Sequence, residues 1–168
     1  MDEVWILVPM TVVYFLLVAP GLYAMFFGAP YIPTDKKRMD AMMKLGDFRK
    51  DDIVYDLGCG DGRVIREVSK RGVKKAVGIE VSVLVYILAK IKGIFIENNA
   101  TIRFGNFWKR DFDDADKLIV FLLERTMKDF EKKIWPKLKV GTIVLSNEFL
   151  MDSIEPTDRQ GRVFLYRK

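Results

Sequence analysis

A run of glycines behind an acidic residue is the part of the sequence best suited to chemistry. Residues 52–63 read DIVYDLGCGDGR. The β-prone residues at the start predict a buried strand, and three alternating glycines allow a tight turn in which the backbone approaches a ligand closely. The periodic residues that follow predict a helix ending near Gly72. Strand, glycine loop and helix together indicate a nucleotide-type site.

The spacing of these glycines separates two cofactors. Dinucleotide folds use G-x-G-x-x-G, which places a pyrophosphate on a helix N-terminus. Here the spacing is G-x-G-x-G, and the carboxylate of Asp56 in front of it repels phosphate but suits a cation. Glu80 ends a second apolar run, where an acid can accept both hydroxyls of a ribose. We therefore predict that Asp56, Gly58, Gly60 and Glu80 bind S-adenosylmethionine, which carries a sulfonium and an ammonium next to its ribose.

The composition excludes several other kinds of chemistry. The chain has no histidine and one cysteine, so a conventional zinc site and Ser-His or Cys-His nucleophiles are excluded. The acid-rich run 111–116 lacks the glycine and the terminal glutamate of a calcium-binding loop, and a solvated loop is expected there. We predict no metal site. Group transfer from a preactivated cofactor is a kind of chemistry that this composition still allows.

Strand and helix patterns alternate along most of the chain. After the strand that leads into the glycine loop, apolar runs predict strands at 75–80, 101–104, 117–123, 142–146 and 162–166. Helices are predicted at 34–44, from 63, from 82 and at 126–136. This alternation predicts an α/β fold, a Rossmann-like sheet with helices on both faces and ligands at the carboxyl ends of its strands. The last strand is expected to pair antiparallel.

The beginning of the chain is strongly apolar. Residues 4–27 contain no charged residue, and as a helix they would span about 36 Å, enough to cross the hydrocarbon core. The acidic start disfavours a signal peptide, and apolar residues on all sides of the helix disfavour a core helix. We predict one N-terminal transmembrane helix at about 4–27. It divides the chain into a membrane anchor at 1–29 and a catalytic domain at 30–168.

The charges around this segment predict its orientation. Acids precede it and three basic residues follow at 36–38, which places the catalytic domain in the cytoplasm. The excess of 28 basic over 23 acidic residues suits an anionic membrane surface or an acidic partner. A second apolar run at 81–96 is interpreted as a buried helix, with contact to a bilayer or a second subunit as the alternative.

Five short motifs carry a resemblance to a known family. They are PYIPT at 30–34, the run 52–63, GNF at 105–107, FLL at 121–123 and SNEF at 146–149. From about Pro30 to its end, the chain resembles the small archaeal protein-lysine methyltransferases, which are related to mitochondrial enzymes that methylate lysines in ATP synthase and the nucleotide carrier. The resemblance implies a class I, seven-β-strand fold. It also implies in-line methyl transfer from S-adenosylmethionine to lysine side chains of proteins.

The resemblance also implies roles for single residues. Asn106 and Phe107 would hold the adenine through one polar edge and one apolar face. Tyr31 would lie over the cofactor and shape a lysine channel, and Glu148 would reach the incoming amine. Tyr31 and Glu148 are thus the predicted catalytic residues. The chain departs from its relatives at Asn147, where they often have histidine, and in its apolar N-terminal segment.

Other functions stay open at this point. A nucleic-acid methyltransferase usually has an N/D-P-P-Y/F run after the fourth strand, and FLLE stands at 121–124 instead, so nucleic acid is not an expected partner. A membrane-anchored methyltransferase of lipids or small molecules is the alternative enzyme. A cofactor-binding module without activity is the alternative outside catalysis, although the retained Asp56 and Glu80 argue against it. A protein with a target lysine, associated with the membrane, is the expected partner.

Overall fold

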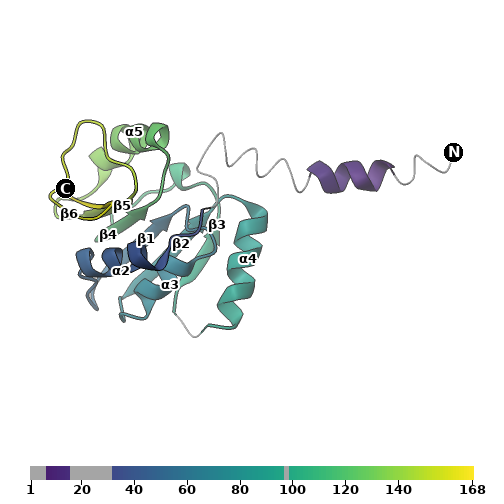
Figure 1. Cartoon of the computed structure of the whole chain (residues 1–168), viewed down its shortest axis with the longest axis horizontal. Helices are drawn as coiled ribbons and strands as arrows, with labels where there is room; N and C mark the ends of the chain where they lie inside the picture. Colours follow the sequence, from purple (N-terminus) through teal and green to yellow (C-terminus); the bar gives the residue numbers. More distant parts are fainter. Residues whose placement is uncertain (1–6, 16–31, 97–98) are drawn as a thin grey trace.

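The described part of the chain forms one twisted sheet with helices on both faces. The computed structural model describes residues 7–15, 32–96 and 99–168 (Figure 1). The strands are β1 Ile53–Leu57, β2 Lys75–Glu80, β3 Thr101–Phe104, β4 Lys117–Val120, β5 Ile143–Asn147, β6 Asp158–Gln160 and β7 Val163–Arg167. The helices are α2 Lys36–Leu45, α3 Arg63–Ser69, α4 Val83–Ile94 and α5 Glu124–Lys133, with short 3₁₀ turns η1 Phe107–Lys109 and η2 Trp135–Lys137.

The strand order reveals where a ligand should bind. The sheet runs β3-β2-β1-β4-β5-β7-β6, with β1 to β5 parallel and β7 antiparallel to both of its neighbours. The chain first builds outward from β1 to β3 and then crosses back to β4, so the order reverses between β1 and β4. Open α/β sheets bind ligands outside the carboxyl ends of the strands at such a switch point. The predicted Rossmann-like sheet and its antiparallel last strand are confirmed.

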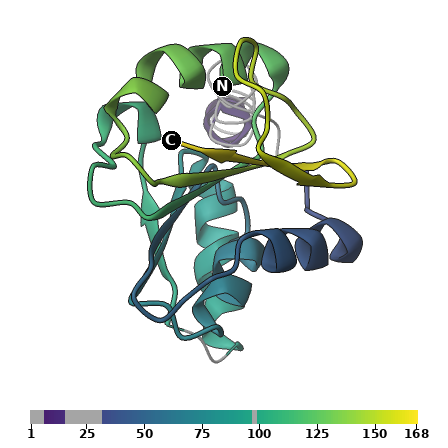
Figure 2. The same cartoon turned by 90° about the vertical axis from the view of Figure 1, so that its left-hand side faces the viewer.

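Alternation along the strands explains the two-sided core. Tyr55 and Leu57 pack in one apolar cluster with residues of α5, whereas Val54 packs in the other cluster with residues of α2 and α3. Because successive side chains of a strand point to opposite faces, a continuous apolar strand requires cover on both faces. Figure 2 shows α5 on one side of the sheet and α2 and α4 on the other.

The predicted transmembrane helix is wrong. Across 7–15, 32–96 and 99–168, no helix has the length and apolar character needed to cross a membrane. Residues 7–15 are helical within the described part of the chain. The single-pass membrane localisation, the cytoplasmic orientation and the membrane partner that depended on this helix are corrected with it. The rest of 4–27 and the predicted boundary at 29–30 lie outside the described residues.

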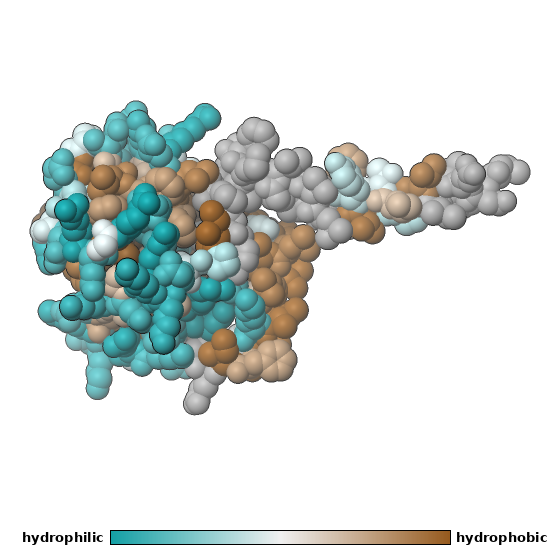
Figure 3. Space-filling model, in the orientation of Figure 1, coloured by the Kyte–Doolittle hydropathy of each residue, from teal (hydrophilic) through white to brown (hydrophobic). Residues whose placement is uncertain are grey.

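The second apolar run also differs from its prediction. Within α4 only Ala89 is buried, so the interpretation of this run as a buried helix is wrong. One face of α4 is apolar and between 36 and 77% exposed, and it consists of Val83, Leu84, Ile87, Leu88, Ile91 and Ile94. The brown surface in Figure 3 includes this face. Apolar character predicted the helix correctly, but it did not reveal that nothing in the described chain covers it.

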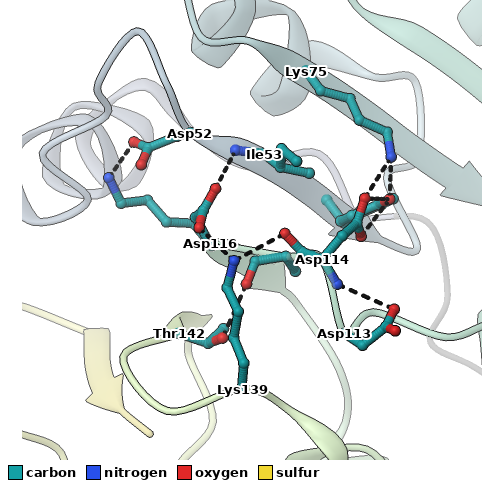
Figure 4. A network of polar contacts seen from close by, with 11 residues as sticks. Asp52, Ile53, Lys75, Asp113, Asp114, Asp116, Lys139 and Thr142 are labelled. Carbon is teal, nitrogen blue, oxygen red and sulfur yellow. Dashed lines mark hydrogen bonds and ion pairs between the residues drawn. The ribbon is translucent and has the colours of Figure 1, made fainter.

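A polar network holds the amino ends of the central strands together (Figure 4). Lys117 on β4 pairs with Asp52, which precedes β1, and both side chains are nearly buried. The Asp116 carboxylate accepts a hydrogen bond from the Ile53 amide at 2.8 Å and pairs with Lys139 at 2.6 Å. The acid-rich run 111–116 was predicted as a solvated loop. Its last residue, Asp116, directly precedes β4 and contacts Ile53 of β1 and Lys139, which precedes β5.

Lys117→Met tests how much this network stabilises the fold. It leaves the Asp52 carboxylate buried without its ion pair, and we expect a loss of about 3 kcal/mol in the free energy of unfolding. The matched variant Lys139→Met removes a more exposed pair and should cost less than about 1 kcal/mol. Urea unfolding of both variants measures the difference. Equal losses would contradict a special role for the buried pair.

Candidate active site

Asp56 lies at the carboxyl end of β1 and is the central residue of the site. Its side chain is 5% exposed and lines a cavity of about 220 Å³, here called the strand-end cavity. Within the described residues, no hydrogen bond or ion pair reaches its carboxylate. Burial, together with the negative charges of Glu80 and Asp61, raises the pKa of Asp56 to about 8. A buried carboxylate without a partner is unfavourable, so the cavity suits a ligand that brings a cation.

Glu80, at the end of β2, presents a second carboxylate to the strand-end cavity. Its Oε2 accepts a hydrogen bond from the Gly60 amide at 2.9 Å, and its Oε1 accepts one from the Ser82 amide at 2.8 Å. Burial raises the pKa of Glu80, although these amide hydrogen bonds oppose the shift. The amides fix the orientation of the carboxylate. Each oxygen keeps a second lone pair, so the group can still accept from two hydroxyls.

The glycine loop depends on backbone conformations that residues other than glycine rarely adopt. Gly58 and Gly60 have φ angles of 78° and 57°, in the left-handed region. The amides of Gly58 and Cys59 donate to the Ile79 carbonyl at 2.9 and 3.0 Å, which fastens the loop across the end of β2. A Cβ atom on Gly78 would lie 2.6 Å from the Cys59 sulfur, so this glycine makes room for the buried thiol.

The structure brings most of the predicted cofactor residues together. Lining residues of the strand-end cavity include Asp56, Gly58, Gly60, Glu80 and Phe107. Asn106 does not line this cavity, and its Oδ1 accepts a hydrogen bond from the Trp108 amide at 2.9 Å, which caps η1. Tyr31 lies outside the described residues. The roles assigned to single residues therefore stay predictions, although five of the six cofactor residues meet in one cavity.

Sequence reasoning missed a polar cluster beneath the glycine loop. Asp61 is 2% exposed, and its carboxylate pairs with Arg63 at 3.0 Å and with Lys92 of α4 at 2.7 Å. Arg63 also donates to the Thr34 carbonyl at 3.2 Å. The cluster thus ties the loop to α4 and to the segment before α2. The nearness of Asp61 and Arg63 in sequence was a usable signal, whereas no local pattern reveals the distant Lys92.

A second cavity adjoins the first. This cavity, here called the side cavity, has a volume of about 300 Å³ and shares Ile32, Phe121 and Leu122 with the strand-end cavity. Glu148, a predicted catalytic residue, lines it. The carboxylate of Glu148 forms ion pairs with Arg38 at 2.8 Å and with Arg162 at 2.6 Å. The two predicted chemical centres, Asp56 and Glu148, therefore line neighbouring cavities with a common apolar wall.

A larger cavity lies elsewhere. It has a volume of about 650 Å³, and its lining includes Trp108 of η1 and Asp129 and Lys133 of α5. None of the predicted site residues that the structure describes lines it. Volume alone would therefore direct attention away from the carboxyl ends of the strands, where the buried acids lie.

Asp56→Asn tests the raised pKa of this carboxyl group. Asp56 has a pKa of about 8 in the folded protein and an ordinary value of 3.8, so between these values the folded state holds a proton that the unfolded chain releases. Stability of the wild type without ligand should therefore fall as pH rises. The stability advantage of Asp56→Asn should grow by about 1 kcal/mol or more between pH 5 and pH 8 in urea unfolding.

Asp116→Asn provides a control of opposite sign. Burial would raise the pKa of Asp116, but hydrogen bonds from Lys139 and the Ile53 amide outweigh it and lower the pKa. Its ionised carboxylate therefore stabilises the fold above the ordinary pKa, and this contribution disappears as pH falls through the lowered value. Asp116→Asn should lose stability at neutral pH. An Asp56→Asn protein with the same pH dependence as wild type would contradict the buried, proton-holding state of Asp56.

Comparison with known proteins identifies the family. A family model described as the ANTKMT methyltransferase domain matches residues 56–158. A protein-lysine N-methyltransferase of Saccharolobus islandicus (strain REY15A) is 39% identical over 132 residues, 77% of this chain and 82% of that protein. The mouse adenine nucleotide translocase lysine N-methyltransferase is 26% identical over 84% of this chain, which spans 63% of that protein's length.

A solved structure of another methyltransferase has a similar fold. The RNA methyltransferase of Salinibacter ruber, in complex with S-adenosyl-L-homocysteine, is 28% identical, with a TM-score of 0.73 over 81% of this chain and 93% of that one. The predicted class I sheet, the predicted resemblance and the predicted methyltransferase activity are confirmed. The chain belongs to the family of ANTKMT methyltransferase domains.

Proposed function

We propose that this methyltransferase transfers a methyl group from S-adenosylmethionine to lysine side chains of proteins. The observation that carries the proposal is the buried Asp56 carboxylate, without a partner, next to the oriented carboxylate of Glu80. One acid suits a cationic group, and the other suits a pair of hydroxyls. The lysine acceptor is supported by the 39% identical Saccharolobus relative, which is a protein-lysine N-methyltransferase.

The residues of the strand-end cavity fit S-adenosylmethionine in three ways. Asp56, once ionised, would pair with the ammonium group, and Glu80 would accept the ribose hydroxyls. The glycines at 58 and 60 let the backbone approach the ligand without a side chain in between. Phe107 provides an apolar wall for the adenine, whereas Asn106 next to it does not line this cavity, and its role toward the adenine amino group stays a prediction from the sequence. The bound cofactor would supply a methyl group on a positively charged sulfur.

The side cavity fits the acceptor lysine. Its lining combines Phe121, Leu122 and Phe149 with the carboxylate of Glu148. An apolar channel disfavours the charged amine and lowers its pKa, so the lysine loses its proton without a dedicated base. The chain has no histidine to act as one. Glu148 would orient the amine and stabilise the positive charge that develops on nitrogen, and the shared wall would align the two groups for in-line transfer.

Tyr31 is the remaining predicted catalytic residue. The residues that follow it, Ile32 and Pro33, line the strand-end cavity, and Ile32 also lines the side cavity. The position of Tyr31 next to these two residues in the sequence supports the proposal that it shapes the lysine channel.

The decisive experiment locates the transferred methyl group. The full chain is incubated with methyl-labelled S-adenosylmethionine and, in separate reactions, with a lysine-rich polypeptide, RNA or lipid vesicles. We expect label in the polypeptide, recovered as methyl-lysine after acid hydrolysis. Label in RNA or in lipid alone would assign a different acceptor. A cofactor that binds without any transfer would point to a binding module.

Glu80→Gln tests the cofactor site without measuring activity. Replacement of one carboxylate oxygen by an amide removes an acceptor that serves both the loop and the ribose, so we expect the Kd for S-adenosylmethionine to rise tenfold or more in calorimetry. The matched control Glu67→Gln changes an exposed glutamate of α3 that pairs with Lys70 and should leave the Kd unchanged. Equal affinity of both variants would remove Glu80 from the cofactor site.

A further inference from the structure

Glu148 has a backbone conformation that non-glycine residues seldom adopt. Its φ angle is 78°, in the left-handed region, directly after β5. The Glu148 amide donates to the Arg162 carbonyl at 2.7 Å, which extends the pairing of β5 with β7 by one residue. Strained backbone of this kind is found preferentially at functional sites. Here it directs a carboxylate toward the side cavity.

Each oxygen of this carboxylate already holds one arginine. Oε2 pairs with Arg38 of α2 at 2.8 Å, and Oε1 pairs with Arg162 at 2.6 Å. The Glu148 side chain is only 14% exposed, so both cations sit at an acid that is largely removed from solvent. A lysine that enters the side cavity therefore meets a carboxylate that already pairs with two cations, although each oxygen keeps a second lone pair.

The two arginines differ in how firmly they are held. Arg38 is 32% exposed and has a second acidic partner, Asp35, at 3.2 Å. Arg162 is 67% exposed, follows Gly161 in the turn between β6 and β7, and pairs only with Glu148 in the described ranges. Exposed ion pairs contribute little free energy, because both ions remain partly hydrated and a long side chain must be ordered. Arg162 is thus the partner that another cation can displace.

We propose that Arg162 occupies the position on Glu148 that the ammonium group of the acceptor lysine takes during binding. The inference rests on the proposed lysine methylation. Guanidinium and ammonium groups both donate hydrogen bonds to a carboxylate, so one can replace the other at Oε1. Arg38 stays on Oε2, and the buried acid is never left unpaired during the exchange. Arg162 acts as an internal competitor of the acceptor and raises the KM for it.

Arg162→Ala tests the competition in the full chain. With a lysine-containing peptide and labelled S-adenosylmethionine, we expect the KM for the peptide to fall about two- to fivefold, the range of an exposed ion pair. The Kd for S-adenosylmethionine should not change, because Arg162 does not line the strand-end cavity. Arg159→Ala is the matched control, since it removes an exposed arginine from the same hairpin that lines neither cavity. It should leave the KM as in wild type.

A double variant separates competition from a structural role. Glu148→Gln alone should raise the KM for the peptide, and Arg162→Ala should lower the KM no further in the Glu148→Gln background. Three results would overturn the proposal. Arg162→Ala could still lower the KM in the Glu148→Gln background, or Arg159→Ala could lower the KM equally. The third is an unchanged KM for Arg162→Ala when its Tm matches that of wild type. In each of these cases wild type still methylates the peptide. Wild type without any label in protein would instead refute lysine methylation itself.

Discussion

The site depends on two buried carboxylates at the ends of neighbouring parallel strands. β1 and β2 pair in parallel with Asp56 opposite Gly78, which places the ends of both strands, and hence Asp56 and Glu80, at one edge of the sheet. The glycine loop can only follow this edge because its amides bond to Ile79 and Glu80. Burial, together with the negative charges of Glu80 and Asp61, raises the pKa of Asp56 to about 8, so the group holds a proton at neutral pH. A ligand cation would stabilise the ionised carboxylate and offset the cost of its burial.

The opposite edge of the sheet has the reverse electrostatic character. There every acid of the network has a partner, as in the contacts of Lys117 with Asp52 and of Lys139 with Asp116 (Figure 4). The amino ends of the strands therefore stabilise the fold, whereas Asp56 at the carboxyl ends has no partner among the described residues and stays available for a ligand. The same strands run from one edge of the sheet to the other. The contacts that stabilise the amino ends of the strands therefore also hold the buried acids at the carboxyl ends in place. This division agrees with the general position of ligands in open α/β sheets.

Local patterns predicted those features that depend on local interactions. The strand, glycine loop and helix at 52–69 followed from β propensity, turn glycines and periodicity. Asp56, Gly58, Gly60 and Glu80 were predicted from spacing, whereas Asn106 and Phe107 came from the family resemblance. Apolar character alone was less informative, because it does not distinguish buried from exposed surface. The helix α4 was misjudged for this reason. The apolar stretch 4–27 predicted a membrane-spanning helix, and no helix in the described part of the chain could cross a membrane. Pairs such as Asp61 with Lys92 join residues far apart in sequence, and no local pattern encodes them.

The two cavities differ in what determines them. In the strand-end cavity, Asp56, Gly58, Gly60 and Glu80 follow from turn glycines and strand ends, which explains why these four were predictable from spacing. Glu148 lines the side cavity and pairs with Arg38 and Arg162, and these three residues come from a strand end, a helix and a turn that meet only in the folded chain. None of the three is a predicted cofactor residue. Under the proposed function they act on the acceptor, so the acceptor must be argued from these long-range ion pairs and not from local spacing.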